Sequence, residues 1–128
     1  MIIVYILLAC AAAYAVYYTL QFKKQSSAMV NYTPEQVVER RSDTNVVILD
    51  VRTDMERNRN QINGSIHIPL GDIEARAGEL SPYKKKEIIC YCQGGVRSVT
   101  AAAKLKELGF NASNMMGGIA EWNSKKLK

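Results

Sequence analysis

Hydrophobic residues fill the first part of the chain, and short apolar runs separated by polar segments make up the rest. Residues 1–22 carry no charged side chain, whereas all 17 Lys and Arg and all 12 Asp and Glu lie from Lys23 onward. A helix of that length spans about 30 Å, the thickness of the hydrocarbon core of a bilayer. Tyr5 stands near one end and Tyr17 and Tyr18 near the other, as in an interfacial aromatic belt. The pattern predicts one transmembrane helix over residues 1–22.

A cleaved signal peptide is the alternative for this segment, and two features argue against it. No basic residue precedes the apolar run, and the run is longer than the apolar region of a usual signal peptide. Residues 7–10 resemble a lipoprotein cleavage box, but strongly apolar residues follow Cys10. We therefore expect a retained single-pass anchor in the cell membrane, bound to the lipid bilayer through residues 1–22. Lys23 and Lys24 follow it, so the positive-inside rule places the rest of the chain in the cytoplasm.

A short polar linker is predicted over residues 23–29, and a single α/β domain over residues 30–128. The apolar runs 46–49 and 87–91 have the β-branched composition of strands buried on both faces, which is typical of parallel sheets. Helical patterns alternate with these runs. This alternation predicts a small, mostly parallel sheet with helices on both faces.

Several helix boundaries carry recognisable signals. Thr33, Pro34 and Gln36 have the spacing of a capping box with proline in the first turn, so a helix is predicted to start there. Gly109 follows a helical pattern that ends at Leu108 and is predicted to cap it. Weaker patterns predict an edge strand within 29–32, a last strand at 112–116 and a final helix at 119–125.

Cys92 stands where the predicted strand 87–91 ends, and Arg97 and Ser98 open the helix that follows. Free amides at a helix N-terminus and the helix dipole both favour an anion there. The glycine pair between them lets successive amides turn inward, and Arg97 adds a permanent positive charge. We expect these surroundings to favour the thiolate, which is the nucleophilic form of cysteine. Cys92 is therefore the candidate catalytic residue, and a buried structural cysteine is the alternative.

Five segments in this order resemble the rhodanese (sulfurtransferase) domain, and together they cover nearly all of residues 30–128. They are Val47–Arg52, Glu56, Ile62–Leu70, Cys92–Ser98 and Met116–Trp122. The resemblance implies a rhodanese-like fold and a sulfurtransferase that carries sulfur as a persulfide on Cys92. The implied donor is a small anion such as thiosulfate, and the acceptor is cyanide, a thiol or a protein that accepts sulfur. No metal or organic cofactor is implied.

The loop after Cys92 is expected to bind the substrate. Its members are Gln93, Gly94, Gly95, Val96, Arg97 and Ser98; their amides would hold the anionic sulfur, and Arg97 would help to bind the donor. Four residues separate Cys92 from Arg97. The related cell-cycle phosphatases have one more residue in this loop, which makes room for a phosphate. The shorter loop favours sulfur transfer over a small phosphatase or an arsenate reductase. A membrane-tethered binding module with little turnover is the other alternative.

Asp50 and Arg52 follow the strand predicted at 46–49. Ligands of open α/β sheets bind beyond the carboxyl ends of strands, so both residues should lie near the Cys92 loop if the two strands are neighbours. They could support the loop or meet the substrate, but we favour a structural ion pair. Close by, the sequence departs from the family pattern. Arg57 replaces an aromatic residue, and Asn60-Gln61 replaces a glycine-histidine pair.

The cysteines, the single histidine and the net charge argue against a disulfide, a zinc site and nucleic-acid binding. Cys90 and Cys92 are two residues apart in an extended segment, which is poor geometry for a disulfide and suits a reducing compartment. With one histidine, His67, and three cysteines, the chain offers no zinc-binding set, and we expect His67 to be structural or exposed. The net charge is +5, but no basic stripe with stacking aromatic residues is present, so we do not expect nucleic-acid binding.

Overall fold

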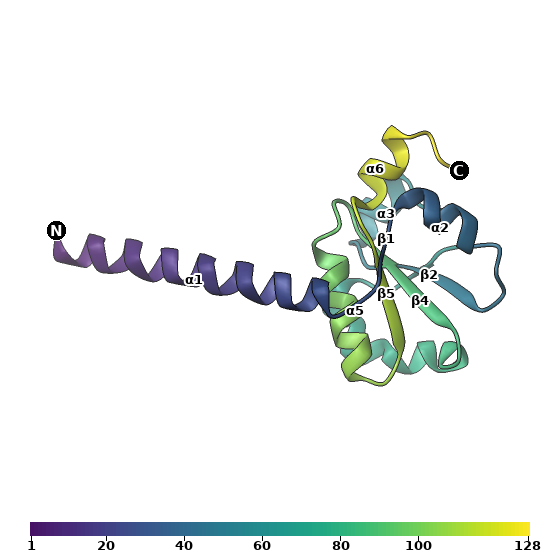
Figure 1. Cartoon of the computed structure of the whole chain (residues 1–128), viewed down its shortest axis with the longest axis horizontal. Helices are drawn as coiled ribbons and strands as arrows, with labels where there is room; N and C mark the ends of the chain where they lie inside the picture. The colour runs from purple at the N-terminus through teal and green to yellow at the C-terminus, as the bar shows by residue number, and fades with distance from the viewer.

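The computed structural model describes residues 1–128 and consists of a long N-terminal helix joined to an α/β domain (Figure 1). Helix α1 runs over Ile2–Ser27 and projects away from the domain. Residues 1–20 are all exposed. The helix is long and apolar enough to cross a membrane, a test that a signal sequence also passes. An apolar surface of this size needs either lipid or a partner around it.

The junction between α1 and the domain differs from the linker predicted over residues 23–29. The helix continues to Ser27, because the lysines, glutamines and serines there tolerate a helix and no glycine or proline ends it. Only residues 28–30 separate α1 from the first strand. The side-chain amide of Asn31 donates to the carbonyl of Ser26 at 2.8 Å and to that of Met29 at 3.2 Å. The connection is therefore short and tied to the domain.

Five parallel strands form one sheet in the order β1-β5-β4-β2-β3. The strands are β1 (Asn31–Tyr32), β2 (Val46–Asp50), β3 (Ile66–His67), β4 (Glu87–Tyr91) and β5 (Asn111–Met115). The prediction of a mostly parallel sheet is confirmed. The central strands β2 and β4 pair along their whole length, from Val46 opposite Glu87 to Asp50 opposite Tyr91. Asp50 therefore ends beside the strand that leads into Cys92.

Helices cover both faces of the sheet, as predicted. They are α2 (Pro34–Arg40), α3 (Asp54–Arg59), α4 (Ile73–Arg76), α5 (Arg97–Glu107) and α6 (Gly118–Ser124), with 3-10 turns η1 (Leu70–Asp72) and η2 (Ala77–Tyr83). The capping box of α2 is present, since Thr33 and Gln36 exchange hydrogen bonds of 2.9 and 3.2 Å. Gly109 follows α5 with φ at +91°, as a C-terminal glycine cap requires. The last strand and helix begin and end one residue earlier than predicted.

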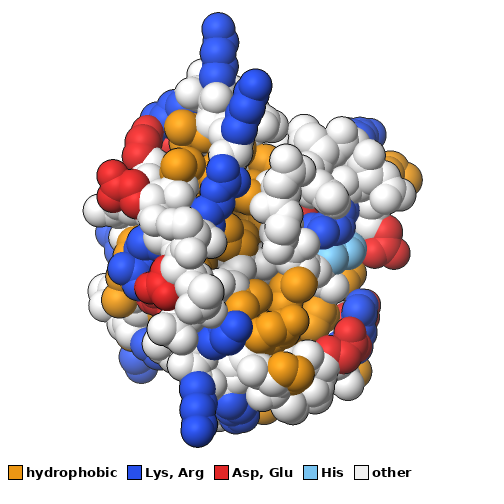
Figure 2. Space-filling view, turned by 90° about the vertical axis from the view of Figure 1, so that its right-hand side faces the viewer, with side chains coloured by type: hydrophobic (Ala, Val, Ile, Leu, Met, Phe, Trp, Pro, Cys, Tyr) orange, Lys and Arg blue, Asp and Glu red, His pale blue; other side chains and the backbone are white.

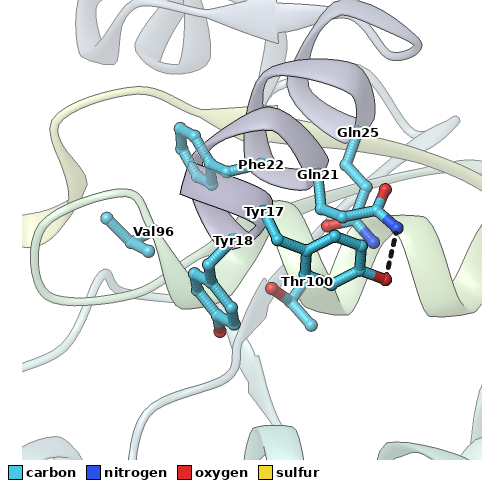
Figure 3. A pocket seen from close by; sticks show the side chains of 7 residues that line it. All are labelled: Tyr17, Tyr18, Gln21, Phe22, Gln25, Val96 and Thr100. Carbon is cyan, nitrogen blue, oxygen red and sulfur yellow. Dashed lines mark hydrogen bonds between the residues drawn. The ribbon is translucent and has the colours of Figure 1, made fainter. Parts of the chain in front are cut away.

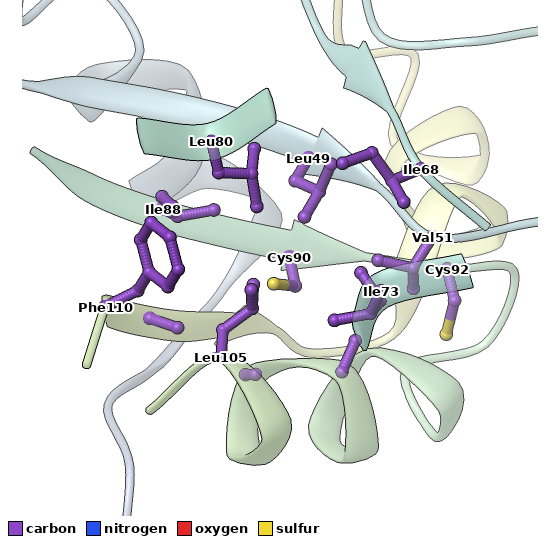
Figure 4. Packing of buried hydrophobic residues seen from close by; sticks show 13 residues of the cluster. Leu49, Val51, Ile68, Ile73, Leu80, Ile88, Cys90, Cys92, Leu105 and Phe110 are labelled. Carbon is purple, nitrogen blue, oxygen red and sulfur yellow. The ribbon is translucent and has the colours of Figure 1, made fainter. Parts of the chain in front are cut away.

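Side chains of β4 are buried on both faces of the sheet. Ile88 and Cys90 belong to the cluster that includes Leu105 of α5 (Figure 4). Ile89 and Tyr91 belong to a second cluster, which includes residues of α2 and α6. This packing explains why the apolar run of β4 is continuous rather than alternating. It also holds the carboxyl end of β4, where Cys92 follows, between two packed layers.

The surface of the domain on the side turned away from α1 is mixed. Basic and acidic side chains are interspersed there, with exposed apolar atoms between them (Figure 2). No single sign of charge covers that face.

Candidate active site

The Cys92 side chain lies at the base of the loop between β4 and α5. It is 1% exposed, and its Sγ accepts a hydrogen bond of 3.0 Å from the amide of Gly95. Sγ also lies 3.4 Å from Oγ of Ser98, in the first turn of α5. No side chain caps this helix, and the amides of Gly94 and Val96 bond no acceptor. The sulfur is therefore placed among amide donors at the positive end of an 11-residue helix.

A series of hydrogen bonds between side chains of α5, β5 and β1 holds Ser98 in place. Its hydroxyl donates to Oδ1 of Asn114 at 2.6 Å, and the Asn114 amide donates to Oδ1 of Asn31 at 3.1 Å. Ser98 and Asn114 are both buried. Asn114 was not among the predicted site residues. An asparagine in a short strand that is otherwise buried was the signal that could have identified it.

Helix α6 supports the loop from the other side. The amide of Ile119 donates to the carbonyl of Cys92 at 2.9 Å, and that of Ala120 donates to the carbonyl of Gln93 at 3.1 Å. The two backbones approach closely because Gly118 has φ at +61°, and a Cβ there would lie 2.4 Å from the Gln93 oxygen. The glycine pair at the start of α6, Gly117 and Gly118, therefore shapes the loop. With the carbonyls bonded to α6, the loop amides remain available to an anion.

The Arg97 side chain pairs with a carboxylate of α3. Its two terminal nitrogens donate to the two carboxylate oxygens of Glu56 at 2.7 and 2.8 Å. Glu56 also closes a capping box with Thr53 at the start of α3. The Arg97 hydrogen bond is the main cause that lowers the pKa of Glu56 to about 2. Glu56 belonged to the family resemblance, but the sequence alone did not show its partner.

The predicted neighbours Asp50 and Arg52 form a buried ion pair below the loop. Arg52 donates Nε and Nη2 to the two Asp50 oxygens at 3.0 and 2.8 Å. Burial alone would raise the pKa of Asp50, but hydrogen bonds from Arg52 outweigh it and lower that pKa. Arg57, which departs from the family pattern, also reaches Asp50 at 3.3 Å and donates to the carbonyl of Ser65 at 2.7 Å. The departure therefore supplies a second cation to a buried carboxylate.

A polar cavity of about 400 Å³ adjoins the loop. Only polar side chains line it: Arg52, Glu56, Arg59, Asn60 and Gln93. Asn60, the other departure from the family pattern, accepts hydrogen bonds from Arg52 through its carbonyl at 2.6 Å and its side chain at 3.2 Å. Arg59 is exposed and forms no ion pair. The cavity therefore offers one uncommitted positive charge beside Gln93.

Two other candidate groups take structural positions. Cys90 is fully buried in β4, and this burial raises the pKa of its thiol. Nε2 of His67 lies 2.7 Å from the carbonyl oxygen of Arg52, so the histidine joins β3 to the end of β2. All three cysteines are free, and no three His, Cys, Asp or Glu side chains are grouped as a metal site requires.

Comparison with known sequences assigns most of the chain to one family. The profile of the rhodanese-like domain matches residues 33–125. The chain is 41% identical over 85 residues to a Bacillus subtilis protein provisionally named sulfur carrier YrkF, matching 66% of this chain but only 45% of that relative. It is 32% identical over 90 residues to a sulfurtransferase of Allochromatium vinosum, covering 69% of this chain and 82% of the relative. It is 29% identical over 80 residues to the thiosulfate sulfurtransferase PspE of Escherichia coli, covering 62% and 77%.

Solved structures share the fold. A rhodanese-related protein of Thermoplasma volcanium superposes with a TM-score of 0.71 at 26% identity, covering 77% of this chain and 95% of that one. A Rhodopseudomonas palustris protein of unknown function, described as a possible tyrosine phosphatase, has a TM-score of 0.76 at 26% identity and covers 84% and 89%.

Gly118→Ala and Gly94→Ala form a matched pair that tests the contact between the loop and α6. A Cβ at Gly118 meets backbone within 2.4 Å, whereas a Cβ at Gly94 meets nothing within 4 Å. The left-handed backbone alone should cost Gly118→Ala about 1–2 kcal/mol, and the close contact should add to this. Gly94→Ala should change the free energy of unfolding by less than about 0.5 kcal/mol. Urea unfolding measures both, and equal stability of the two variants would contradict the contact.

Glu56→Gln tests the ion pair with Arg97 through its pH dependence. Because the pKa of Glu56 is lowered from 4.5 to about 2, the pair stabilises the fold above about pH 5. This stability should be lost as the pH falls from about 4.5 toward 2. Since Arg97 is partly exposed, we expect Glu56→Gln to cost about 1 kcal/mol at pH 7.

The measurement is urea unfolding of the parent and of Glu56→Gln at a series of pH values. The difference between them should shrink below about pH 4.5. Glu74→Gln is the control, because Glu74 is exposed and lies 3.9 Å from its lysine partner. If the difference in free energy of unfolding between the parent and Glu56→Gln stays constant from pH 7 to pH 3, the ion pair of Glu56 with Arg97 does not stabilise the fold.

Proposed function

Because this chain belongs to the family of rhodanese-like domains, we propose that it transfers sulfur through a persulfide on Cys92. Relatives named sulfurtransferases support this role. The Cys92 thiolate attacks the outer sulfur of the donor, forms a new S–S bond and breaks the donor's own S–S bond. With thiosulfate the leaving group is sulfite. A thiolate or cyanide then attacks the outer sulfur of the persulfide and regenerates the Cys92 thiolate.

The observation that carries this proposal is the hydrogen bond from the Gly95 amide to Sγ of Cys92. The same surroundings would stabilise the negative charge of the persulfide, because the amides of Gly94 and Val96, on either side of Gly95, have no acceptor and could donate to it. Ser98 would remain the neighbour of the sulfur, and Asp50 with Arg52 would brace the end of the adjacent strand. These are the roles we assign to the loop and its support.

The polar cavity beside Gln93 is the proposed entry for an anionic donor. Arg59 is its uncommitted cation, and Arg97 contributes charge although Glu56 offsets it. Thiosulfate as the donor is favoured by the relative PspE, which is named for that substrate. A protein acceptor is favoured by the relative named as a sulfur carrier.

We propose that residues 1–22 are retained as a membrane anchor and that residues 30–128 carry out the chemistry. Every residue from 1 to 20 is exposed, so the core of the domain does not depend on them. Lys23 and Lys24 favour a cytoplasmic position for the domain.

A phosphatase is the second candidate, because one structural neighbour carries that description. Two features argue against it: Cys92 is 1% exposed, and its loop is one residue shorter than in the related phosphatases. A small sulfur atom therefore suits the site better than a phosphate ester. A membrane-tethered binding module with little turnover is the other candidate.

Residues 23–128, incubated with thiosulfate, should gain the mass of one sulfur atom. The intact mass is recorded under non-reducing conditions, and circular dichroism checks that the protein is folded. Cys92→Ala should gain nothing, whereas Cys90→Ala should gain the sulfur, because Cys90 is buried in β4. Cyanide should remove the added mass.

A folded domain that gains no sulfur from thiosulfate, persulfides or mercaptopyruvate would contradict sulfur transfer and favour the binding module. Hydrolysis of an aryl phosphate that depends on Cys92 would instead establish the phosphatase.

A further inference from the structure

The end of α1 lies beside the Cys92 loop. A cavity of about 200 Å³ separates them, and Figure 3 shows side chains of both elements pointing into it. From α1 it is lined by Tyr17, Tyr18, Gln21, Phe22 and Gln25, and from the loop and α5 by Val96 and Thr100. Val96 is one of the residues between Cys92 and Arg97. The helix proposed as the membrane anchor and the proposed catalytic loop therefore share one cavity.

This arrangement is held by more than one contact. The ammonium group of Lys106 in α5 donates a hydrogen bond of 2.9 Å to the carbonyl of Ala28, just after α1 ends. Asn31 bonds the last turn of α1 through Ser26. Since only residues 28–30 connect α1 to β1, the domain cannot move far from the end of the helix. In this structure, the two hydrogen bonds and the short connection hold the end of α1 beside α5.

The residues of α1 that face the Cys92 loop indicate how deep the loop lies relative to a bilayer that α1 spans. Phe22 is the last residue before the charged Lys23, so the boundary between hydrocarbon and headgroups falls near Phe22 if α1 spans a bilayer. Tyr18 lies one helical turn, about 6 Å, on the hydrocarbon side of Phe22. Val96 lines the same cavity as both, and it is 55% exposed. An exposed apolar side chain at this level meets lipid rather than bulk water.

The charges around the junction suit a phospholipid surface. A second cavity between α1 and α5, of about 340 Å³, has two basic and one acidic residue in its lining: Lys24, Lys106 and Glu107. Lys23 is also exposed on the same part of α1. Basic residues next to a membrane-spanning helix are attracted to anionic headgroups.

We propose that the Cys92 loop and the first turn of α5 dock on the lipid headgroup layer, with Val96 inserted beside Tyr18 and Phe22. The proposal rests on the membrane anchor described under the proposed function. Sulfur transfer would then take place at the membrane surface. A donor or acceptor that is itself held at that surface would reach the loop without crossing bulk solution.

The test places a fluorescent reporter at Val96 in the full chain. Val96→Trp is reconstituted into vesicles of phosphatidylcholine and phosphatidylglycerol whose acyl chains carry bromine near the headgroup, where bromine quenches tryptophan. Thr44→Trp is the matched control, because Thr44 is exposed in the turn between α2 and β2. Figure 1 shows this turn on the side of the domain away from α1. The signal of Trp122 in the parent chain is subtracted. Thr100→Trp is a second reporter should Val96→Trp fail to fold.

We expect brominated lipid to remove most of the added fluorescence of Val96→Trp and little of that of Thr44→Trp. Equal quenching of the two, in protein that sediments with the vesicles, would overturn the docking but keep the anchor. Protein that stays in the supernatant would overturn both. Sulfur loading of Cys92, measured on the parent chain in the same vesicles, reports separately on the proposed function.

Discussion

The backbone contact between the Cys92 loop and the start of α6 determines where the sulfur lies. Gly95 and Gly118 adopt left-handed conformations, so the two backbones approach to distances that a β-carbon would prevent. The first amides of α6 then bond the carbonyls of Cys92 and Gln93. The loop amides are left for an anion, and Gly95 already uses its amide on the sulfur. Because β4 is packed on both faces, the loop starts from a rigid position.

Ion pairs stabilise the carboxyl ends of β2 and β4, where the Cys92 loop begins. Asp50 forms ion pairs with Arg52 and Arg57. Glu56 of α3 forms an ion pair with Arg97 at the start of α5. A buried carboxylate needs such partners, because an isolated charge is strongly unfavourable away from water. The pairs leave few free cations near Cys92. Arg59 is the cation in the neighbouring cavity without a carboxylate partner, and for this reason we propose that cavity as the entry for a small anionic donor.

Local signals in the sequence were sufficient for four of the five strands, for the caps at Thr33 and Gly109 and for the turn that holds Cys92, because apolar runs and glycines act over a few residues. Partners distant in the sequence could not be predicted. Glu56 lies 41 residues from Arg97, and only tertiary packing brings them together. The end of α1 shows a different limit. Polar residues without glycine or proline extend a helix as readily as they form a linker, so composition alone did not decide its length. That extension brings the end of α1 to the Cys92 loop.

A crystal structure of the sulfur-loaded domain would test the central claim most directly. The claim is that the loop amides, rather than a side chain, hold the transferred sulfur. The account predicts that the outer sulfur of the Cys92 persulfide lies within hydrogen-bond distance of the free amides of Gly94 and Val96, with α6 still bonded to the loop carbonyls. An outer sulfur turned away from these amides, or held only by Arg97, would contradict it.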